Sequence, residues 1–195
     1  MATATIEVRP AGPGRWADVE RVLGPKGAYA GCWCMFFRLP GREFEACSGA
    51  PNRDSLRDLV EAGERPPGLL AYVDGEPAGW CAVAPRPDYP RILRSPVNRP
   101  APDDDPADSA VWSVTCFYVP RAHRGSGVAK ALLTEAVTFA AKYGARVVEG
   151  YPRDATPGAH PLSVFMGTPE LFRSAGFGDA ERRSERRSIM RYRIP

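Results

Sequence analysis

The sequence lacks any long apolar run, and its beginning lacks the pattern of a secretion signal. No stretch reaches the roughly 18 apolar residues that a membrane-spanning helix needs, and MATATIEVRPAG has no basic start followed by an apolar core. We therefore expect a cytoplasmic protein that does not enter a membrane. Its 195 residues, of which 44% are hydrophobic and 25% charged, fit one globular domain over residues 1–195, because no linker is visible.

Cysteine, histidine and lysine are scarce, and their scarcity argues against several kinds of site. The five cysteines are odd in number and lack the spacing of a disulfide framework, which indicates free thiols. With only two histidines available as further ligands, Cys32-Trp33-Cys34 is a poor metal site, and we expect no metal. The net charge is only +3, and the arginine-rich segment 181–188 contains acids and no aromatic residues for stacking, so we expect no nucleic acid as partner.

Hydrophobic periodicity predicts alternating strands and helices. We expect strands at 5–9, 69–73, 80–84, 111–119, 146–151 and 189–194, with a partner of the last one beginning at Phe177, and helices at 13–23, 52–62, 126–143 and 169–175. Asp74-Gly75 predicts a tight hairpin, and Asn52 is a candidate cap of the second helix. Residues 111–151 predict a βαβ unit whose helix packs an apolar stripe on the sheet: Ala129, Leu132, Leu133, Ala136, Val137 and Ala140.

Residues 85–110 are so rich in proline that they predict a long loop insertion without a helix or a central strand. Long loops in compact domains often bind substrates. The loop carries an acidic cluster, which either attracts a cationic amine or is simply solvated: Asp103, Asp104, Asp105 and Asp108.

The densest chemical signal is VPRAHRGSGVAKALL at the start of the predicted 126–143 helix. Gly125 and Gly127 allow close approach of an anion to backbone amides that have no partner within the helix, and nearby arginine and lysine side chains add positive charge. A tight turn with a solvated basic rim is the alternative. A Walker loop is not indicated, because GxxxxGK followed by Ser or Thr is missing. A dinucleotide-binding turn is a minor alternative: Glu149 lies 22 residues beyond Gly127, near the place of a ribose-binding acid, but Lys130 stands where the third glycine is required.

The segment RGSGVA at Arg124–Ala129 resembles the motif of the GCN5-related N-acetyltransferases (GNAT), which is Arg or Gln, two residues, Gly, one residue, then Gly or Ala. The order of the predicted elements and the late Ala175-Gly176-Phe177 extend the resemblance over nearly the whole chain. It implies an α/β (α+β) fold with a mixed central sheet of about six to seven strands flanked by about four helices, in which splayed parallel strands form the acetyl-CoA cleft.

The resemblance also implies a site for acetyl-CoA as the acyl-donor substrate. Its pyrophosphate is expected on Arg124 and on the amides of Gly125, Ser126, Gly127, Val128, Ala129 and Lys130, and its pantetheine arm along Phe117, Tyr118 and Val119. Since the segment between the first two helices borders the acceptor pocket in this family, Trp33 and Phe36 are expected in its apolar wall, with core packing as the alternative.

Two catalytic groups common in the family are missing. The tyrosine that protonates the leaving thiolate is replaced by Phe172, and the strand before the motif offers Ser113 and Thr115 in place of a basic glutamate. Glu149 and Tyr151 are the nearest replacements as general base and acid, although either is alternatively a plain strand residue.

We therefore expect an N-acetyltransferase, a monomer or homodimer, that transfers acetyl directly to a primary amine of a small molecule or a protein within a ternary complex. Because the two common groups are missing, a non-enzymatic CoA-binding sensor or interaction domain remains the alternative.

Overall fold

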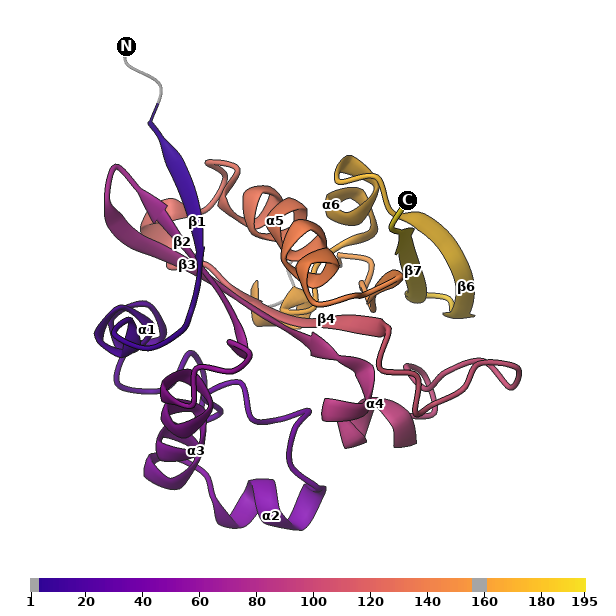
Figure 1. Cartoon of the computed structure of the whole chain (residues 1–195), viewed down its shortest axis with the longest axis horizontal. Coiled ribbons are helices and arrows are strands. Elements are labelled where there is room, and N and C mark those ends of the chain that lie inside the picture. Colours follow the sequence, from indigo (N-terminus) through magenta and orange to yellow (C-terminus); the bar gives the residue numbers. More distant parts are fainter. Residues whose placement is uncertain (1–3, 156–160) are drawn as a thin grey trace.

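The computed structural model describes residues 4–155 and 161–195, and all the strands in this part of the chain lie in one mixed sheet (Figure 1). The sheet order is β1-β2-β3-β4-β5-β7-β6, and only β4 and β5 are parallel neighbours. The strands are β1 (Ile6–Pro10), β2 (Gly68–Val73), β3 (Glu76–Pro85), β4 (Val111–Tyr118), β5 (Val147–Gly150), β6 (Gly178–Ser184) and β7 (Arg187–Arg193).

Helices cover both faces of the sheet (Figure 1). The helices are α1 (Trp16–Leu23), α2 (Gly41–Ala46), α3 (Ala50–Glu61), α4 (Pro90–Arg94), α5 (Val128–Lys142) and α6 (Pro169–Ser174), with 3₁₀ turns at Arg86–Asp88, Arg121–His123 and Pro161–Val164. Helices α5 and α6 lie on one face, and α1 to α4 on the other. In the described residues we find no helix with the length and apolar character needed to cross a membrane.

The core under α5 forms largely as the predicted stripe requires. Leu132, Leu133, Ala136 and Ala140 are buried, and the predicted Val137 packs against this core while partly exposed. Val128 and Phe139 are also buried there, whereas the predicted Ala129 is not part of it. Burial of each leucine contributes about 1.5–3 kcal/mol of hydrophobic stabilisation.

The core on the opposite face joins α1, α3 and the loop between α1 and α2. Asn52 does not cap α3, because that helix begins at Ala50 and the buried Asn52 amide donates to the Gly31 carbonyl oxygen at 3.1 Å. The same loop places four non-glycine residues in left-handed conformations, with φ between 45° and 68°: Ala28, Ala30, Trp33 and Cys34. All five cysteines are free thiols, as predicted.

The hairpin between β2 and β3 turns at Asp74-Gly75, as predicted. Asp74 has φ 50° and Gly75 φ 86°, and two successive positive φ values match the twist of flanking strands in a two-residue turn.

Strands β4 and β5 are paired only over a short distance. The parallel register runs from Val111↔Val147 to Val114↔Gly150, and β4 continues to Tyr118 without β5 beside it. The expected fold, a mixed sheet whose parallel strands part at one end, is therefore confirmed, with the short helices α2 and α4 in addition to the predicted ones.

The prediction that residues 85–110 contain no helix is wrong. Strand β3 extends to Pro85, a 3₁₀ turn follows, and α4 begins with Pro90 at its first position. A proline is tolerated in the first turn of a helix because the amide it lacks would have no partner there.

Candidate active site

The glycine-rich turn has the backbone geometry that the sequence predicts for anion binding. Gly125 and Gly127 have φ values of 78° and 90°, and Gly127 caps α5 without any side chain bonded to the first helical amides. Arg124 and Lys130 are exposed beside this helix start. The turn thus offers backbone donors, a helix dipole and cationic side chains at one place. Binding of pyrophosphate by residues Arg124 to Lys130 stays a prediction.

The exposed end of β4 is partly occupied by the protein itself. The Phe117 amide donates to the Phe165 carbonyl oxygen at 2.7 Å, the Arg124 Nε donates to the Val119 carbonyl oxygen at 3.0 Å, and Tyr118 pairs with Trp80 of β3. A pantetheine arm that pairs with this strand would therefore have to displace the segment around Phe165 or use other groups of the strand.

A cavity of about 530 Å³ lies on the face of the sheet that carries α4. It is bordered by α4, by the chain around Phe36 and Phe37, and by Phe165 and Met166; we call it the α4 cavity. Because Phe165 is bonded to β4 where that strand has left β5, the cavity adjoins the split from the side opposite α5. Its volume is within the usual range for small-molecule sites.

The two residues predicted for an acceptor pocket differ in position. Phe36 lines the α4 cavity, and its ring makes an edge contact with Phe37 at a centroid distance of 4.8 Å. Trp33 does not line this cavity; it is 4% exposed and packs against Trp16 with ring centroids 6.0 Å apart. Trp33 is therefore a core residue, which was the alternative interpretation of this segment.

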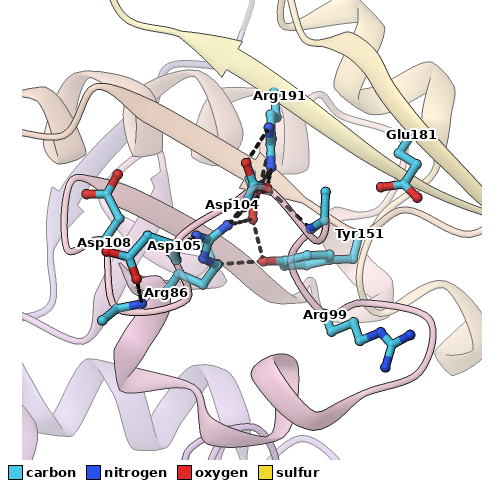
Figure 2. Close-up of polar contacts among 12 residues, drawn as sticks. Arg86, Arg99, Asp104, Asp105, Asp108, Tyr151, Glu181 and Arg191 are labelled. Atoms are coloured by element: carbon cyan, nitrogen blue, oxygen red, sulfur yellow. Dashed lines mark hydrogen bonds and ion pairs between the residues drawn. The ribbon is translucent and has the colours of Figure 1, made fainter.

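Glu149 lies at the centre of a buried polar network, and Figure 2 shows three of the residues that contact it: Arg86, Tyr151 and Arg191. Its two carboxylate oxygens accept hydrogen bonds from Arg86 Nη1 at 3.2 and 3.3 Å, and Arg191 Nε donates to Oε1 at 2.7 Å. The Tyr151 hydroxyl donates to Oε2 at 3.0 Å and lies 2.7 Å from Ser113 Oγ. A carboxylate has about four lone-pair sites, so these four hydrogen bonds fill its capacity.

The network reaches into the proline-rich loop. Arg191 forms an ion pair with Asp104, and Arg86 Nη2 donates to the Asp105 carbonyl oxygen at 2.6 Å. Figure 2 shows Arg86, Asp104 and Arg191 converging from the loop and from β7. Within the acidic cluster, the Asp104 carboxylate is thus neutralised by arginine, although its side chain is still 26% exposed.

Electrostatics within the network favour fixed ion pairs. Partial burial opposes ionisation of Asp104, but its hydrogen bond with Arg191 prevails and lowers the pKa of that carboxyl. Burial lowers the pKa of Arg191, but Asp104 and Glu149 together raise it above its usual value. Burial, reinforced by the Glu149 charge, raises the pKa of Tyr151 well above 10. The phenol is thus held protonated next to the carboxylate.

These contacts bear on the two predicted catalytic groups. A general base needs a free lone pair toward the amine, and a general acid needs its proton directed at the leaving group. In the structure Glu149 accepts from two arginines and a tyrosine, and the Tyr151 hydroxyl is turned to Ser113 and Glu149. The catalytic roles stay predictions, and the geometry favours a positioning role for both residues.

Phe172, which stands in place of the usual tyrosine, is fully buried at the end of β5. Its Cε1 atom lies 1.9 Å from where a Cβ on Gly150 would be, so Gly150 is required for the ring to fit. The ring also contacts Phe117 and Phe177, with centroid distances of 6.2 and 5.0 Å.

Sequence reasoning missed Arg86, Arg191 and the arginines of the α4 cavity. Arg86 is 63 residues from Glu149, so no local spacing connects them. One signal was available, because a glutamate within the apolar run VVEGY of a central parallel strand is buried and therefore requires a cationic partner.

Comparison with known proteins agrees with this architecture. The family model described as "Acetyltransferase (GNAT) family" matches residues 33–162, which is more than half of the chain. No curated protein sequence matches the chain.

Among similar solved structures is a GCN5-related N-acetyltransferase from Kribbella flavida, at 19% identity and TM-score 0.52, covering 97% of this chain and 98% of that chain. PaiA N-acetyltransferase from Thermoplasma acidophilum, in complex with coenzyme A, is 13% identical with TM-score 0.53 and coverages of 97% and 99%. YncA from Salmonella typhimurium, solved with its cofactor acetyl-CoA, is 14% identical with TM-score 0.51 and coverages of 97% and 94%. At these identities the likeness concerns the fold alone. The family match over residues 33–162 settles the assignment: the chain belongs to the acetyltransferase (GNAT) family.

Proposed function

We propose that the protein transfers the acetyl group of acetyl-CoA directly to a primary amine, with both substrates bound at once. The observation that carries the proposal is the split between β4 and β5. On one side of it lies a cationic helix start whose first amides bond no side chain, and on the other side lies the α4 cavity. Two substrates can then approach the split from opposite faces. Acetyl-CoA belongs on the α5 side, because its phosphates need the backbone donors of the Gly125–Gly127 turn.

The reaction itself needs little covalent chemistry from the protein. The amine nitrogen bonds to the thioester carbonyl carbon, the carbon–sulfur bond breaks, the amine loses a proton, and the leaving thiolate gains one. We propose that the chain contributes chiefly by positioning. The Glu149 network ties the proline-rich loop to β5 and β7, and Phe172 fixes the end of β5 where the strands part.

The test is a rate measurement with acetyl-CoA and a set of primary amines, in which release of free thiol and the mass of the acetylated amine are both recorded. Thiol release that depends on the amine supports the proposal. A protein that binds coenzyme A but never releases thiol faster with any amine would instead be a CoA-binding sensor, which contradicts the proposal.

A matched variant tests the placement of acetyl-CoA. Gly127 has φ 90° and caps α5, so Gly127→Val forces a β-branched residue into a strained conformation in the turn. We expect calorimetry to show no binding of coenzyme A by this variant, while its thermal unfolding stays cooperative. Normal affinity for coenzyme A would mean that the phosphates bind elsewhere.

A further inference from the structure

The α4 cavity is lined by three arginines and by no acidic residue: Arg91, Arg94 and Arg187. None of their guanidinium groups pairs with a carboxylate in residues 4–155 and 161–195. Arg91 and Arg187 are half-buried and Arg94 is exposed, whereas the buried Arg86 is paired with the Glu149 carboxylate. A cavity with three cations and no anion lacks a counter-charge that a ligand would supply.

Two of these arginines are held in place by α4. Arg91 and Arg94 are three residues apart and so lie on one side of this short helix, and Ile92 is fully buried and anchors it. The guanidinium carbon of Arg91 lies 3.9 Å from the ring centroid of Phe36 and 5.7 Å from that of Phe44. Stacking on a ring orients the guanidinium while its N–H edges stay available for a planar or tetrahedral anion.

The third arginine approaches from the sheet. Arg187 begins β7 and pairs with Arg153 across an isolated bridge. Burial, together with the neighbouring charge of Arg153, lowers the pKa of Arg187. The guanidinium thus lies in a positive potential that a bound anion would relieve.

We propose that the acceptor amine carries an anionic group, a carboxylate or a phosphonate, which binds Arg91, Arg94 and Arg187 while an apolar body packs on Phe37, Phe165 and Met166. This inference rests on the proposed function and narrows its acceptor to one chemical class. Arginine is suited to both anions because its N–H groups match their oxygens in pairs.

The same charges bear on how the amine loses its proton. The three arginines outnumber the negative charges of the ligand, so the net positive charge that is left, together with removal from water, disfavours the ammonium form and lowers the pKa of the bound amine. A fraction of the bound acceptor is then a free amine, and no carboxylate in the cavity is needed to remove its proton.

The experiment compares matched amines that differ only in the acidic group. Each of three amines, with benzyl, isobutyl and unbranched side chains, is prepared as the carboxylate, the phosphonate and the carboxamide. Acetylation rates are measured at saturating acetyl-CoA, and binding of each compound is measured by calorimetry with coenzyme A present. We expect kcat/KM for at least one anionic form to exceed that of its carboxamide by about 10- to 100-fold, as expected for hydrogen bonds to a charged group.

Variants then assign the effect to the cavity. Arg91→Met and Arg187→Met keep most of the side-chain length and remove the charge, and Arg57→Met removes a charge from the exposed surface of α3 as the matched control. We expect the two cavity variants to lose most of the preference for the anionic form, and the control to keep it. The difference between the carboxylate and phosphonate arms identifies which anion fits.

The outcomes separate this inference from the function on which it rests. If carboxamides are acetylated and bound as well as the anionic forms, or if no form shows a preference in either measurement, the inference is overturned. Failure of the proposed function has another signature: no binding of coenzyme A, or no amine-dependent thiol release with any compound, charged or neutral.

Discussion

Replacing Glu149 by glutamine separates two roles for this residue. The side chain keeps its size but loses its charge, and Arg86, whose side chain is 1% exposed, loses its main counter-charge. Removing one partner of a buried ion pair costs about 3–5 kcal/mol because the remaining charge is left uncompensated. In a chain of this length each kcal/mol lowers Tm by about 2–4 °C, so we expect a drop of about 6–20 °C.

The assay combines urea unfolding with initial rates at saturating substrates, measured well below the Tm of the variant. If Glu149 has a positioning role, the Glu149→Gln variant loses stability and its kcat per folded molecule stays within about tenfold. If Glu149 is the general base, kcat falls by about 10²–10⁴. A loss of kcat in that range with an unfolding free energy changed by less than about 1 kcal/mol would refute our reasoning.

Two comparisons make this result specific. Asp179→Asn removes a carboxylate from an ion pair with Arg173 whose side chains are 52% and 56% exposed, and such surface pairs contribute about 0–1 kcal/mol. Combining Arg86→Met with Glu149→Gln should cost less than the sum of the single changes, by about 0.5–3 kcal/mol, because the double variant leaves no unpaired charge at Arg86. Strict additivity would mean that the pair is not energetically coupled.

Three further predictions concern packing and ionisation. Gly150→Ala places a Cβ within 1.9 Å of Phe172, so urea unfolding should show a loss of about 1–3 kcal/mol, and unchanged stability would contradict the described fit. Phe172→Tyr buries a hydroxyl among apolar side chains, and we expect a similar loss of stability with no gain in kcat. A higher kcat would contradict this and would mean that the new hydroxyl acts as the general acid. Burial raises the pKa of Tyr89 to about 12, so the folded state holds this proton more tightly than the unfolded state, whose tyrosines titrate near 10. The stability from this group is therefore complete below pH 10 and is lost as the pH rises toward 12. Unfolding curves measured against pH should show this loss in the unaltered protein, and Tyr89→Phe should abolish it.

Local patterns in the sequence were sufficient for the strands, for helices α1, α3, α5 and α6, and for the turn before α5. The βαβ unit and the Asp74-Gly75 hairpin depend on periodicity and on turn chemistry within a few residues, and both are found. The prediction of no helix in residues 85–110 failed because proline is excluded from the interior of a helix but not from its first turn. Pro90 stands in that turn, at the start of α4.

The candidate site was less predictable because its contacts join distant parts of the chain. Arg191 and Asp104 are 87 residues apart, and their pairing depends on the sheet order that brings β7 beside β5. Trp33 lies in a segment without a period, so nothing in the sequence distinguishes a cavity wall from the core. The fold decides both cases.

The left-handed residues in the loop between α1 and α2 imply an uneven distribution of stability. A non-glycine residue in this conformation costs about 1–2 kcal/mol, and four of them occur within residues 28–34, directly before Phe36 of the α4 cavity. Strain of this kind is released when a segment opens locally, whereas the seven-stranded sheet gains nothing by opening. We therefore expect backbone amides of this loop to exchange their hydrogens with solvent much faster than those of β3 and β4. One wall of the cavity would then adjust to an incoming ligand while the split between β4 and β5 keeps its geometry.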